Sequence, residues 1–303
     1  MAVHLLHASR LDGEPSQVPA AALDDLEIRT WNQPGLGLAD PGRKNQSGLD
    51  VPMDPVHLGR NPTFAATIKI TAKLKAMKLI ELQGRRVLIT QAGDFMGPAL
   101  ERVFTALDAV VVADPRPLGD DRSMAARVIE EAGVIDVLIV HLALPAPATA
   151  VSDVDDDEWR RVFAHLVDPL PRLMRAALPQ MTARGAGKVV LIGSASALRG
   201  MKRTSTYSAA RGAQIAWVRA AGVELARQNI QLNAIAQNFV DNPTYFPPEV
   251  QANPAFQERL KREVPLGRLV SGDEDALFAA YLASDAAACF VGQVFPVCGG
   301  WVA

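Results

Sequence analysis

Short apolar runs alternate with longer segments of helical periodicity along the chain from residue 86 onward. The apolar runs predict strands at residues 87–90, 109–112, 135–140, 188–192 and 230–236. The segments between them predict helices at residues 98–107, 123–132, 158–181 and 207–228. Such alternation is typical of a parallel sheet that is covered by helices on both faces. We therefore expect a doubly wound α/β domain with a ligand site at the carboxyl ends of its strands.

The first part of the chain has a different pattern. Residues 1–61 are rich in Pro, Gly, Asp and Ala and show little periodicity, whereas residues 63–82 (TFAATIKITAKLKAMKLIEL) read as an amphipathic helix. This change predicts an N-terminal extension over residues 1–80, with a helix near 63–82, followed by the main domain over residues 81–303. The apolar face of that helix could lie on a membrane surface. We expect it instead to pack on its own protein or on another subunit.

Composition and charge argue against several classes of function. The chain has 303 residues and a formal net charge of −2, so nothing indicates binding to nucleic acid or to an anionic membrane. No run approaches the roughly 18–20 apolar residues of a membrane span, and the N-terminus lacks the pattern of a secretory signal. Cys289 and Cys298 are expected to be free core thiols of a cytoplasmic protein. The chain has no CxxC pair, and we expect no metal site.

A serine, a tyrosine and an arginine gather where the fourth predicted strand leads into the next helix. Ser194 follows the strand, and Tyr207 and Arg211 are spaced to lie on one face of a helix. A free tyrosine has a pKa of about 10 and is a poor base near neutral pH, but a fixed cation nearby can lower that pKa by roughly 1 to 3. The three residues could therefore hold a substrate hydroxyl and remove its proton. The alternative is an exposed Tyr–Arg pair and an unrelated loop serine.

The loop after the first predicted strand lacks most of the glycines that a dinucleotide needs. In VLITQAGDFMG (residues 87–97), Gln91 and Phe95 stand where a nucleotide-binding short-chain dehydrogenase has the glycines of its TGxxxGxG loop. Only Gly97 remains, and the Phe95 ring would occupy space that the dinucleotide requires. The alternative is a glycine-poor turn whose phenylalanine packs into the core.

An acidic residue, Asp114, follows the second predicted strand, where such a residue can bind the ribose of a nucleotide. Only about two dozen residues separate Asp114 from the next predicted strand. That length leaves little room for the extra strand and helix that usually form the wall of an adenine pocket. We therefore interpret Asp114 as a loop acid rather than a ribose ligand.

Together these features resemble the halohydrin dehalogenases, lyases derived from the short-chain dehydrogenases. The resemblance rests on the Ser-Tyr-Arg residues, on the aromatic residue in the former glycine loop, and on the lack of a cofactor motif. It covers about residues 82–303, with further matches at IAQNFV (235–240), PTYFPPE (243–249), VPLGRL (264–269) and GQVFPVCGGW (292–301). It implies the Rossmann-like, doubly wound parallel sheet of the short-chain dehydrogenases. It also implies a homotetramer with the helices 158–181 and 207–228 at an interface.

The resemblance further implies a reaction and roles for particular residues. Halohydrin dehalogenases convert vicinal haloalcohols to epoxides with release of halide, and in reverse they open epoxides with small anions, without nicotinamide or metal. By resemblance, Tyr207 is the base, Ser194 binds the substrate hydroxyl and Arg211 lowers the pKa of the tyrosine. The halide site would be formed by Phe95 and by the loop Gln237, Asn238, Phe239 and Val240.

Residues that follow separate strands are expected to meet in one crevice. Phe95, Leu142, Ser194 and Gln237 each come after a predicted strand end. Parallel strands bring such ends to one edge of the sheet, so one site can contain all four. Tyr245, in the aromatic loop PTYFPP, is expected to form a wall for the substrate, with a surface turn as the alternative.

Two other functions are compatible with parts of the sequence. Asp114 and Gly97 would support a divergent NAD(P)-dependent short-chain oxidoreductase, which the side chains in the glycine loop oppose. A catalytically inactive subunit that serves binding or assembly is a third function, which the intact serine and tyrosine oppose. His141 could face the crevice, but we interpret it as a packed wall residue. The partner that we expect is a small haloalcohol or epoxide together with a halide or another small anion.

Overall fold

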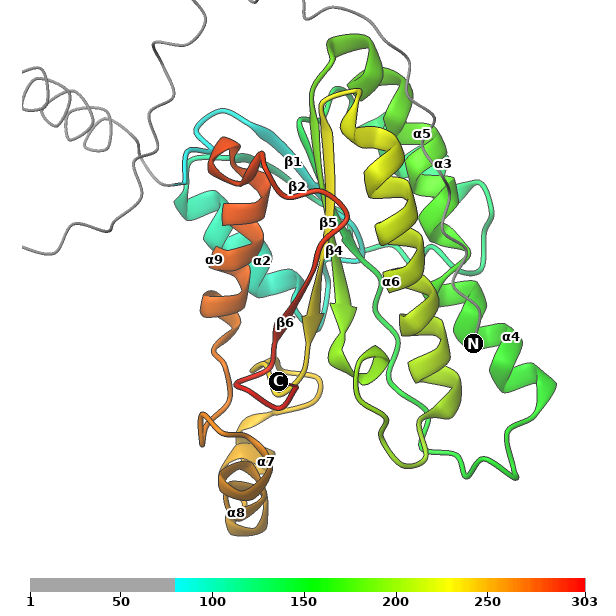
Figure 1. Ribbon diagram of the computed structural model, residues 1–303, viewed down its shortest axis with the longest axis vertical. Coiled ribbons are helices and arrows are strands. Elements are labelled where there is room, and N and C mark those ends of the chain that lie inside the picture. The colour runs from blue at the N-terminus through cyan, green and yellow to red at the C-terminus, as the bar shows by residue number, and fades with distance from the viewer. Residues whose placement is uncertain (1–79, 303) are drawn as a thin grey trace, which may run out of the picture. The chain divides into compact units, whose positions relative to one another are not determined.

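Six parallel strands form the sheet in the computed structural model, which describes residues 80–302 (Figure 1). Their order across the sheet is β2-β1-β3-β4-β5-β6. The strands are β1 (Arg86–Ile89), β2 (Val110–Ala113), β3 (Val137–His141), β4 (Gly187–Ser194), β5 (Ile230–Gln237) and β6 (Val294–Val297). The chain builds the sheet from β1 toward one edge and then toward the other, so the predicted doubly wound parallel sheet is confirmed.

Helices cover both faces of the sheet, and each face has its own apolar core (Figure 1). One face is covered by α2 (Gly97–Ala106) and α9 (Gly272–Ala283). The other is covered by α3 (Met124–Ala132), α4 (Asp156–Leu166), α5 (Pro169–Arg184) and α6 (Ser205–Ala226). Successive residues of a strand point to opposite faces, so Leu191 packs in one core and Ile192 in the other. Burial on both faces explains why the central strands read as continuous apolar runs.

The single helix predicted over residues 158–181 is wrong, because the chain forms two helices there. α4 ends at Leu166, and α5 begins at Pro169. Proline has no backbone N–H and its ring clashes with the carbonyl four residues earlier, so it suits the first turn of a helix better than the interior. The break leaves the carbonyl of Leu166 free, and the buried side-chain amide of Gln214, on α6, donates to it.

The chain forms further elements after β5 that the periodicity does not predict. They are α7 (Pro248–Gln251), α8 (Pro254–Glu263), α9 and β6. α8 is mostly exposed and α7 is a single turn, so neither has a long apolar stripe to reveal it. α9 has a clear start signal, because the side chains of Ser271 and Glu274 form a capping box. β6 contains Pro296, which lowers its strand character and fits its place at the edge of the sheet.

The predicted N-terminal extension, with most of its helix near 63–82, lies outside the described residues. Residues 80–82 are described and are not helical. No helix between residues 80 and 302 is long and apolar enough to cross a membrane. In the same part of the chain, no group of His, Cys, Asp and Glu side chains is arranged to hold a metal ion. Both cysteines are free, but only Cys298 is buried as expected, whereas Cys289 is exposed.

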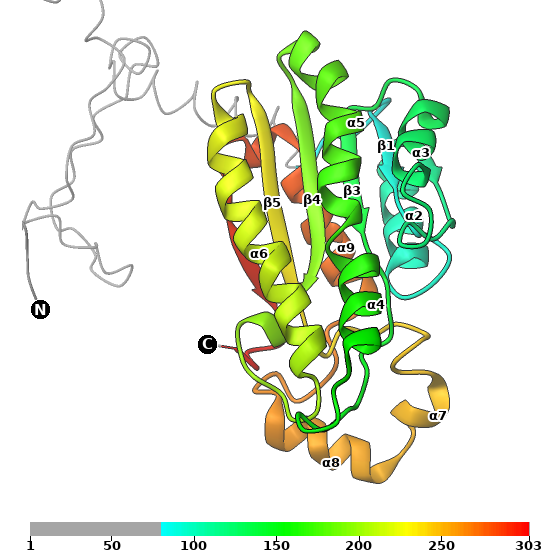
Figure 2. The ribbon, with the colours of Figure 1, turned by 90° about the vertical axis from the view of Figure 1, so that its right-hand side faces the viewer.

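The carboxyl ends of β4 and β5 point toward the part of the molecule where α7 and α8 lie (Figure 2). Loops that follow β1, β3, β4 and β5 meet at this edge of the sheet, as they do in other doubly wound folds. The short helix η3 (Ala195–Ala197) and the first turns of α6 complete it. The fold therefore brings segments that are far apart in the sequence to one place.

Gly97, at the start of α2, fits so closely that a methyl group has no room. A Cβ added there would lie 2.1 Å from the carbonyl oxygen of Ala92. We expect Gly97→Ala to lower the free energy of unfolding by about 1–3 kcal/mol, because backbone rather than a flexible side chain must move.

Gly212→Ala, on α6, is the matched control. Nothing lies within 4 Å of a Cβ added to Gly212, so this change should be neutral or should stabilise the helix by up to about 1 kcal/mol. Urea unfolding measures both variants. Equal stabilities for Gly97→Ala and Gly212→Ala would contradict the prediction.

Candidate active site

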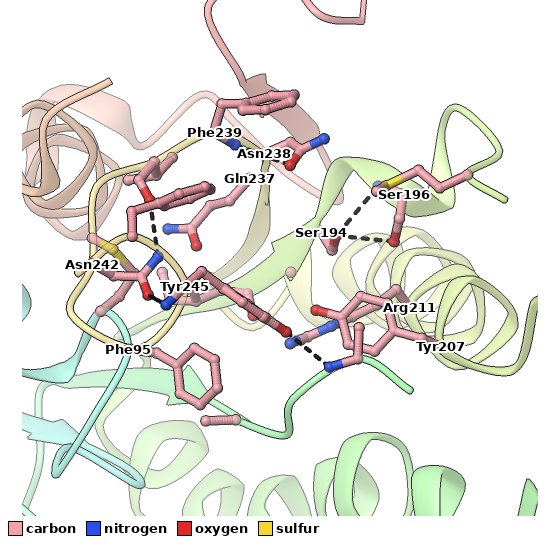
Figure 3. A pocket seen from close by; sticks show the side chains of 18 of the residues that line it. Phe95, Ser194, Ser196, Tyr207, Arg211, Gln237, Asn238, Phe239, Asn242 and Tyr245 are labelled. Carbon is pink, nitrogen blue, oxygen red and sulfur yellow. Dashed lines mark hydrogen bonds between the residues drawn. The ribbon is translucent and has the colours of Figure 1, made fainter. Parts of the chain in front are cut away.

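A cavity of about 360 Å³ opens at the carboxyl edge of the sheet (Figure 3). Its walls come from the loops after β1, β3, β4 and β5, from the start of α6 and from α8. The structure brings together these predicted site residues in its lining: Phe95, Ser194, Tyr207, Arg211, Gln237, Asn238, Phe239, Val240 and Tyr245. Segments more than a hundred residues apart in the sequence therefore form one site.

Leu142 is the exception among the predicted site residues, because it does not line the cavity. Its side chain is fully buried in the core beneath α6, on the opposite face from that of its neighbour His141. His141, the last residue of β3, lines the cavity in its place. The prediction was off by one residue, and a shift of one position along a strand reverses the direction of the side chain. Leu142 still contributes its carbonyl oxygen, as described below.

Ser194, Tyr207 and Arg211 lie together where β4 meets α6 (Figure 3). Ser194 ends β4, and its Oγ lies 2.9 Å from the Oγ of Ser196 and accepts from the Ser196 N–H at 3.2 Å. Tyr207, in the first turn of α6, is only 8% exposed. Arg211 follows one helical turn later, and its guanidinium carbon lies 5.0 Å from the centroid of the Tyr207 ring. The hydroxyls of a serine and a tyrosine and one cation thus share the same wall.

The Arg211 guanidinium is buried and is held by neutral groups. Its Nη2 donates to the carbonyl of Leu142 at 3.1 Å, and its Nη1 donates to the carbonyl of Ile192 at 3.2 Å and to Gln214 at 3.1 Å. Within residues 80–302 no carboxylate pairs with it, and its Nε has no partner. A buried cation without a counter-ion favours a negative charge close by. Tyr207 is the ionisable group over which this cation lies.

The loop after β1 keeps the backbone of a glycine loop without its glycines. Gln91 has φ 48° and Phe95 has φ 46°, both in the left-handed region that costs a residue with a side chain roughly 1–2 kcal/mol. Both side chains are engaged. The Oε1 of Gln91 accepts from the N–H of Ala143 at 2.9 Å. The Phe95 ring packs edge-on against the ring of Tyr245, with the centroids 5.2 Å apart.

Backbone N–H groups in this loop also donate hydrogen bonds within the protein. The N–H of Phe95 donates to the hydroxyl of Thr244, in the loop after β5, at 3.2 Å. Gly97, the remaining glycine, is needed for its close approach to Ala92. The carboxylate of Asp114 is held by Arg116, whose Nη2 lies 2.5 Å from its Oδ2 and 2.6 Å from Glu131. Asp114 is therefore a paired loop acid.

His141 is a neutral wall residue. Burial lowers the pKa of His141 to about 4, and the nearby charge of Arg211 acts in the same direction. Its Nδ1 lies 3.0 Å from the carbonyl oxygen of Gln91, to which it donates as a neutral ring. The ring also meets Phe95 edge-on, with the centroids 6.5 Å apart. His141 thus joins the loop after β1 to the end of β3.

Tyr245 places a second phenol in the cavity (Figure 3). The turn that carries it is held by Asn242, whose Oδ1 accepts from the N–H groups of Thr244 at 3.2 Å and Tyr245 at 2.9 Å. The Tyr245 hydroxyl accepts from the N–H of Ala146 at 2.9 Å. Burial, together with the neighbouring Tyr207, raises the pKa of Tyr245 to about 12. Tyr245 therefore remains a hydrogen-bond donor at neutral pH.

The loop after β5 offers a side-chain amide to the cavity. The N–H of Phe239 donates to the Oδ1 of Asn238 at 2.9 Å, and the N–H of Asn238 donates to the carbonyl of Val297 at 3.1 Å. The Nδ2 of Asn238 is buried and has no partner among the described residues. It is therefore an unsatisfied side-chain donor in this part of the cavity lining. Phe239, the next residue, has a left-handed backbone at φ 52°.

Some lining residues are not found from the sequence. Phe256 and Arg259 come from α8, and the Arg259 guanidinium carbon lies 5.5 Å from the Phe239 ring centroid. Because α8 lacks a clear periodic pattern, no signal connects it with the site. The further lining residues outside the predicted set are Met96, Ala143, Ala146, Ile192, Gly193, Ser196, Met201, Thr204, Asn242, Phe246 and Val250.

Comparison with known sequences gives relatives that act in reduction or dehydrogenation. Residues 74–302 match a family model described as enoyl-(acyl carrier protein) reductase. The chain is 31% identical over 248 residues to the 3-oxoacyl-(acyl-carrier-protein) reductase FabG of Pseudomonas aeruginosa, covering 73% of this chain and 98% of that protein. It is 33% identical over 189 residues to the cis-4-hydroxycyclohexanecarboxylate dehydrogenase of Sinomonas cyclohexanicum, covering 61% of this chain and 74% of that protein.

Solved structures include one with a different activity. A protein described as a dehalogenation enzyme superposes with a TM-score of 0.68 at 32% identity, covering 73% of this chain and 99% of that chain. The L-sorbose reductase of Gluconobacter frateurii, solved with NADPH and L-sorbose, superposes with a TM-score of 0.66 at 20% identity. That match covers 73% of this chain and 97% of the reductase, and at such identity it shows the shared fold alone.

The lowered pKa of His141 predicts a dependence of stability on pH. His141 is charged in the unfolded chain below about pH 6.5, but in the folded protein it stays neutral down to about pH 4. Its contribution to stability is therefore fully present above pH 6.5 and is lost as the pH falls through 4. His141→Asn cannot titrate, so its free energy of unfolding should fall less over this window, by up to about 3 kcal/mol.

Urea unfolding of wild type and variant across this pH range measures the difference. His165→Asn, at a position outside the cavity lining, is the control and should follow the wild type more closely. Parallel curves for wild type and His141→Asn would show that His141 is not a buried neutral histidine.

Proposed function

The chain belongs to the short-chain dehydrogenase/reductase family, and we propose that within this family it is a halohydrin dehalogenase. It would convert vicinal haloalcohols to epoxides with release of halide, and in reverse open epoxides with small anions. The observation that carries the proposal is the loop after β1. Its backbone keeps the left-handed glycine conformations at Gln91 and Phe95, but side chains fill the space, while Ser194, Tyr207 and Arg211 line the same cavity.

The residues present do not fit a nicotinamide dinucleotide. A pyrophosphate in such folds is held by free N–H groups of the glycine loop and by the helix that follows. Here the N–H of Phe95 is bonded to Thr244, and the Phe95 ring lies between Tyr245 and His141. The acid that could bind a ribose, Asp114, is paired with an arginine. The rings of Phe95, Tyr245 and His141 thus fill space that the cofactor would need.

Proton transfer is assigned to the tyrosine. Tyr207, whose ring lies beside the Arg211 cation, takes the proton from a carbon-bound hydroxyl. Ser194 donates a hydrogen bond to that oxygen. The resulting alkoxide forms a C–O bond to the neighbouring carbon while the C–halogen bond breaks, and the halide leaves with the bonding electron pair. Because ring closure is intramolecular, positioning of the two carbons supplies much of the acceleration.

The leaving halide needs a weakly polar site on the other side of the cavity. Aromatic ring edges carry a partial positive charge, and Phe95 and Phe239 line the cavity. Asn238 supplies the unsatisfied donor, its buried Nδ2. We infer that this side-chain amide contributes to halide binding. Arg259 also lines the cavity, but it is paired with Glu263 at 3.1 Å.

A divergent NAD(P)-dependent oxidoreductase is the second candidate function. It is favoured by the sequence relatives, since FabG of Pseudomonas aeruginosa is a reductase that the chain matches over 98% of its length. In that function the serine and tyrosine would act on a carbonyl or hydroxyl, as hydride passes between substrate and nicotinamide. Saturable binding of NADH or NADPH at micromolar concentration would favour it over dehalogenation.

The central prediction concerns halide release without cofactor. Incubation of the protein with a vicinal bromohydrin and no nucleotide should release bromide and form the epoxide. Tyr207→Phe should lower this rate by a factor on the order of 100 to 10,000, because the proton acceptor is lost while the ring remains. Tyr281→Phe, on α9 and outside the cavity lining, is the matched control and should retain the rate. Wild-type protein that releases bromide only when NADPH is added would overturn the proposal.

A further prediction concerns Arg211. Arg211→Met removes the buried cation that lies over the Tyr207 ring, and it should lower the rate of halide release by a factor on the order of 10 to 100. Arg211→Lys keeps a charge but cannot reach the same carbonyls with a planar fork, so its loss of rate should be smaller. Equal rates for wild type and folded Arg211→Met would assign Arg211 a purely structural role.

A further inference from the structure

A buried carboxyl group, Asp275, lies behind the cavity and has no part in the proposed reaction. It stands near the start of α9, and its side chain is fully buried. Its Oδ2 accepts a hydrogen bond from the side-chain amide of Gln237, whereas its Oδ1 has no partner among the described residues. Burying a carboxyl with one hydrogen bond and no cation is costly, so a purely structural role gives no reason for an acid at this position.

Gln237, which lines the cavity (Figure 3), connects this carboxyl group to it through a hydrogen bond. It is the last residue of β5 and is paired in register with Ser194, the last residue of β4. Its side chain therefore lies beside the serine that binds the substrate hydroxyl in the proposed function. The Nε2 of Gln237 donates to Asp275, which leaves Oε1 as the end available to the cavity.

The carboxamide of Gln237 has two orientations of nearly equal shape but opposite polarity. An ionised Asp275 can only accept, so it requires the Nε2 of Gln237 and leaves an acceptor toward the cavity. A protonated Asp275 can donate to Oε1, which turns the Nε2 hydrogens toward the cavity. Burial raises the pKa of Asp275 to about 7, so both protonation states are populated near neutral pH.

Charged groups on the surrounding elements have partners other than Asp275. Within the described part of the chain, Arg102 of α2 pairs with Asp273 and Arg268 pairs with Glu274. Asp241 accepts a hydrogen bond from the side-chain amide of Gln251. Apart from burial, only the hydrogen bond from Gln237 shifts the pKa of Asp275. The protonation state of Asp275 is thus coupled mainly to the orientation of one side chain.

We propose that Asp275 is a positioning residue that determines, through Gln237, whether the cavity wall beside Ser194 offers a donor or an acceptor. With Asp275 neutral, the Nε2 of Gln237 adds a donor to the same cavity wall as Asn238, and the cavity favours a halide or another small anion. With Asp275 ionised, an acceptor backed by a negative charge disfavours anions and favours a ligand hydroxyl. The inference rests on the proposed function, because it assigns the anion preference of the same cavity.

Bromide binding as a function of pH tests the inference without turnover. Titration calorimetry with sodium bromide at constant ionic strength should give roughly tenfold weaker binding at about pH 9 than at about pH 5, the value of one hydrogen bond to an ion. Asp275→Asn should bind with an affinity that changes much less with pH than that of the wild type. Gln237→Leu should lose much of the pH dependence, because the transmitting amide is absent.

Asp273→Asn is the matched control, since Asp273 is on the same turn of α9 but exposed and paired with Arg102. It should keep the pH dependence of the wild type. The inference is overturned if Asp275→Asn retains the wild-type pH dependence, or if Gln237→Leu retains it undiminished. Those results leave the proposed function intact. No bromide binding by wild-type protein at any pH would overturn both the anion cavity and this inference.

Thermal unfolding without added anion provides a second readout. The raised pKa means that the contribution of Asp275 to stability is fully present below about pH 4, its unfolded pKa, and is lost as the pH rises through about 7. The melting temperature of Asp275→Asn should therefore rise relative to that of the wild type as the pH increases over this range. A constant difference between the two would show that Asp275 does not titrate in the folded protein, and the inference would fail.

Discussion

The buried charge of Arg211 is the interaction on which the rest of the site depends. Its guanidinium donates to the carbonyl of Leu142, which follows β3, and to the carbonyl of Ile192, which lies within β4. It also donates to Gln214 on its own helix. Neutral partners orient a cation without cancelling its charge, so hydrogen bonds offset only part of the cost of burying it. The Tyr207 ring lies beside this charge. The same hydrogen bonds tie the ends of two strands to α6, so one side chain serves both the fold and the electrostatics.

The loop after β1 has a strained backbone that its own side chains support. Gln91 and Phe95 have left-handed conformations, which are strained for residues with side chains. The side chains offset this strain through contacts that a glycine could not make, with Ala143 for Gln91 and with Tyr245 for Phe95. Those contacts join the first strand to the loops after β3 and β5, so this loop forms a wall of the cavity.

Sequence periodicity predicted most of the sheet because buried parallel strands are apolar throughout, and because the segments between them have a regular helical periodicity. It failed where the outcome depends on a single residue or a distant contact. Pro169 divides a periodic segment that otherwise reads as one helix. Leu142 and His141 differ by one position, which pattern alone does not resolve at a strand end. The contact between Gln237 and Asp275 joins residues 38 apart in sequence, and neither position carries a local signal for it.

The net charge in and around the cavity depends on which side chains can become neutral. Burial favours the neutral form of each titratable side chain, so the pKa of His141 falls, those of Tyr245 and Asp275 rise, and all three tend toward neutrality. Arginine cannot respond in this way, because its guanidinium remains charged in proteins. The cavity is therefore left with Arg211 as its unpaired positive charge among the described residues. In the proposed reaction an alkoxide and then a halide would form, and one fixed cation behind Tyr207 would stabilise the first without standing at the site that must release the second.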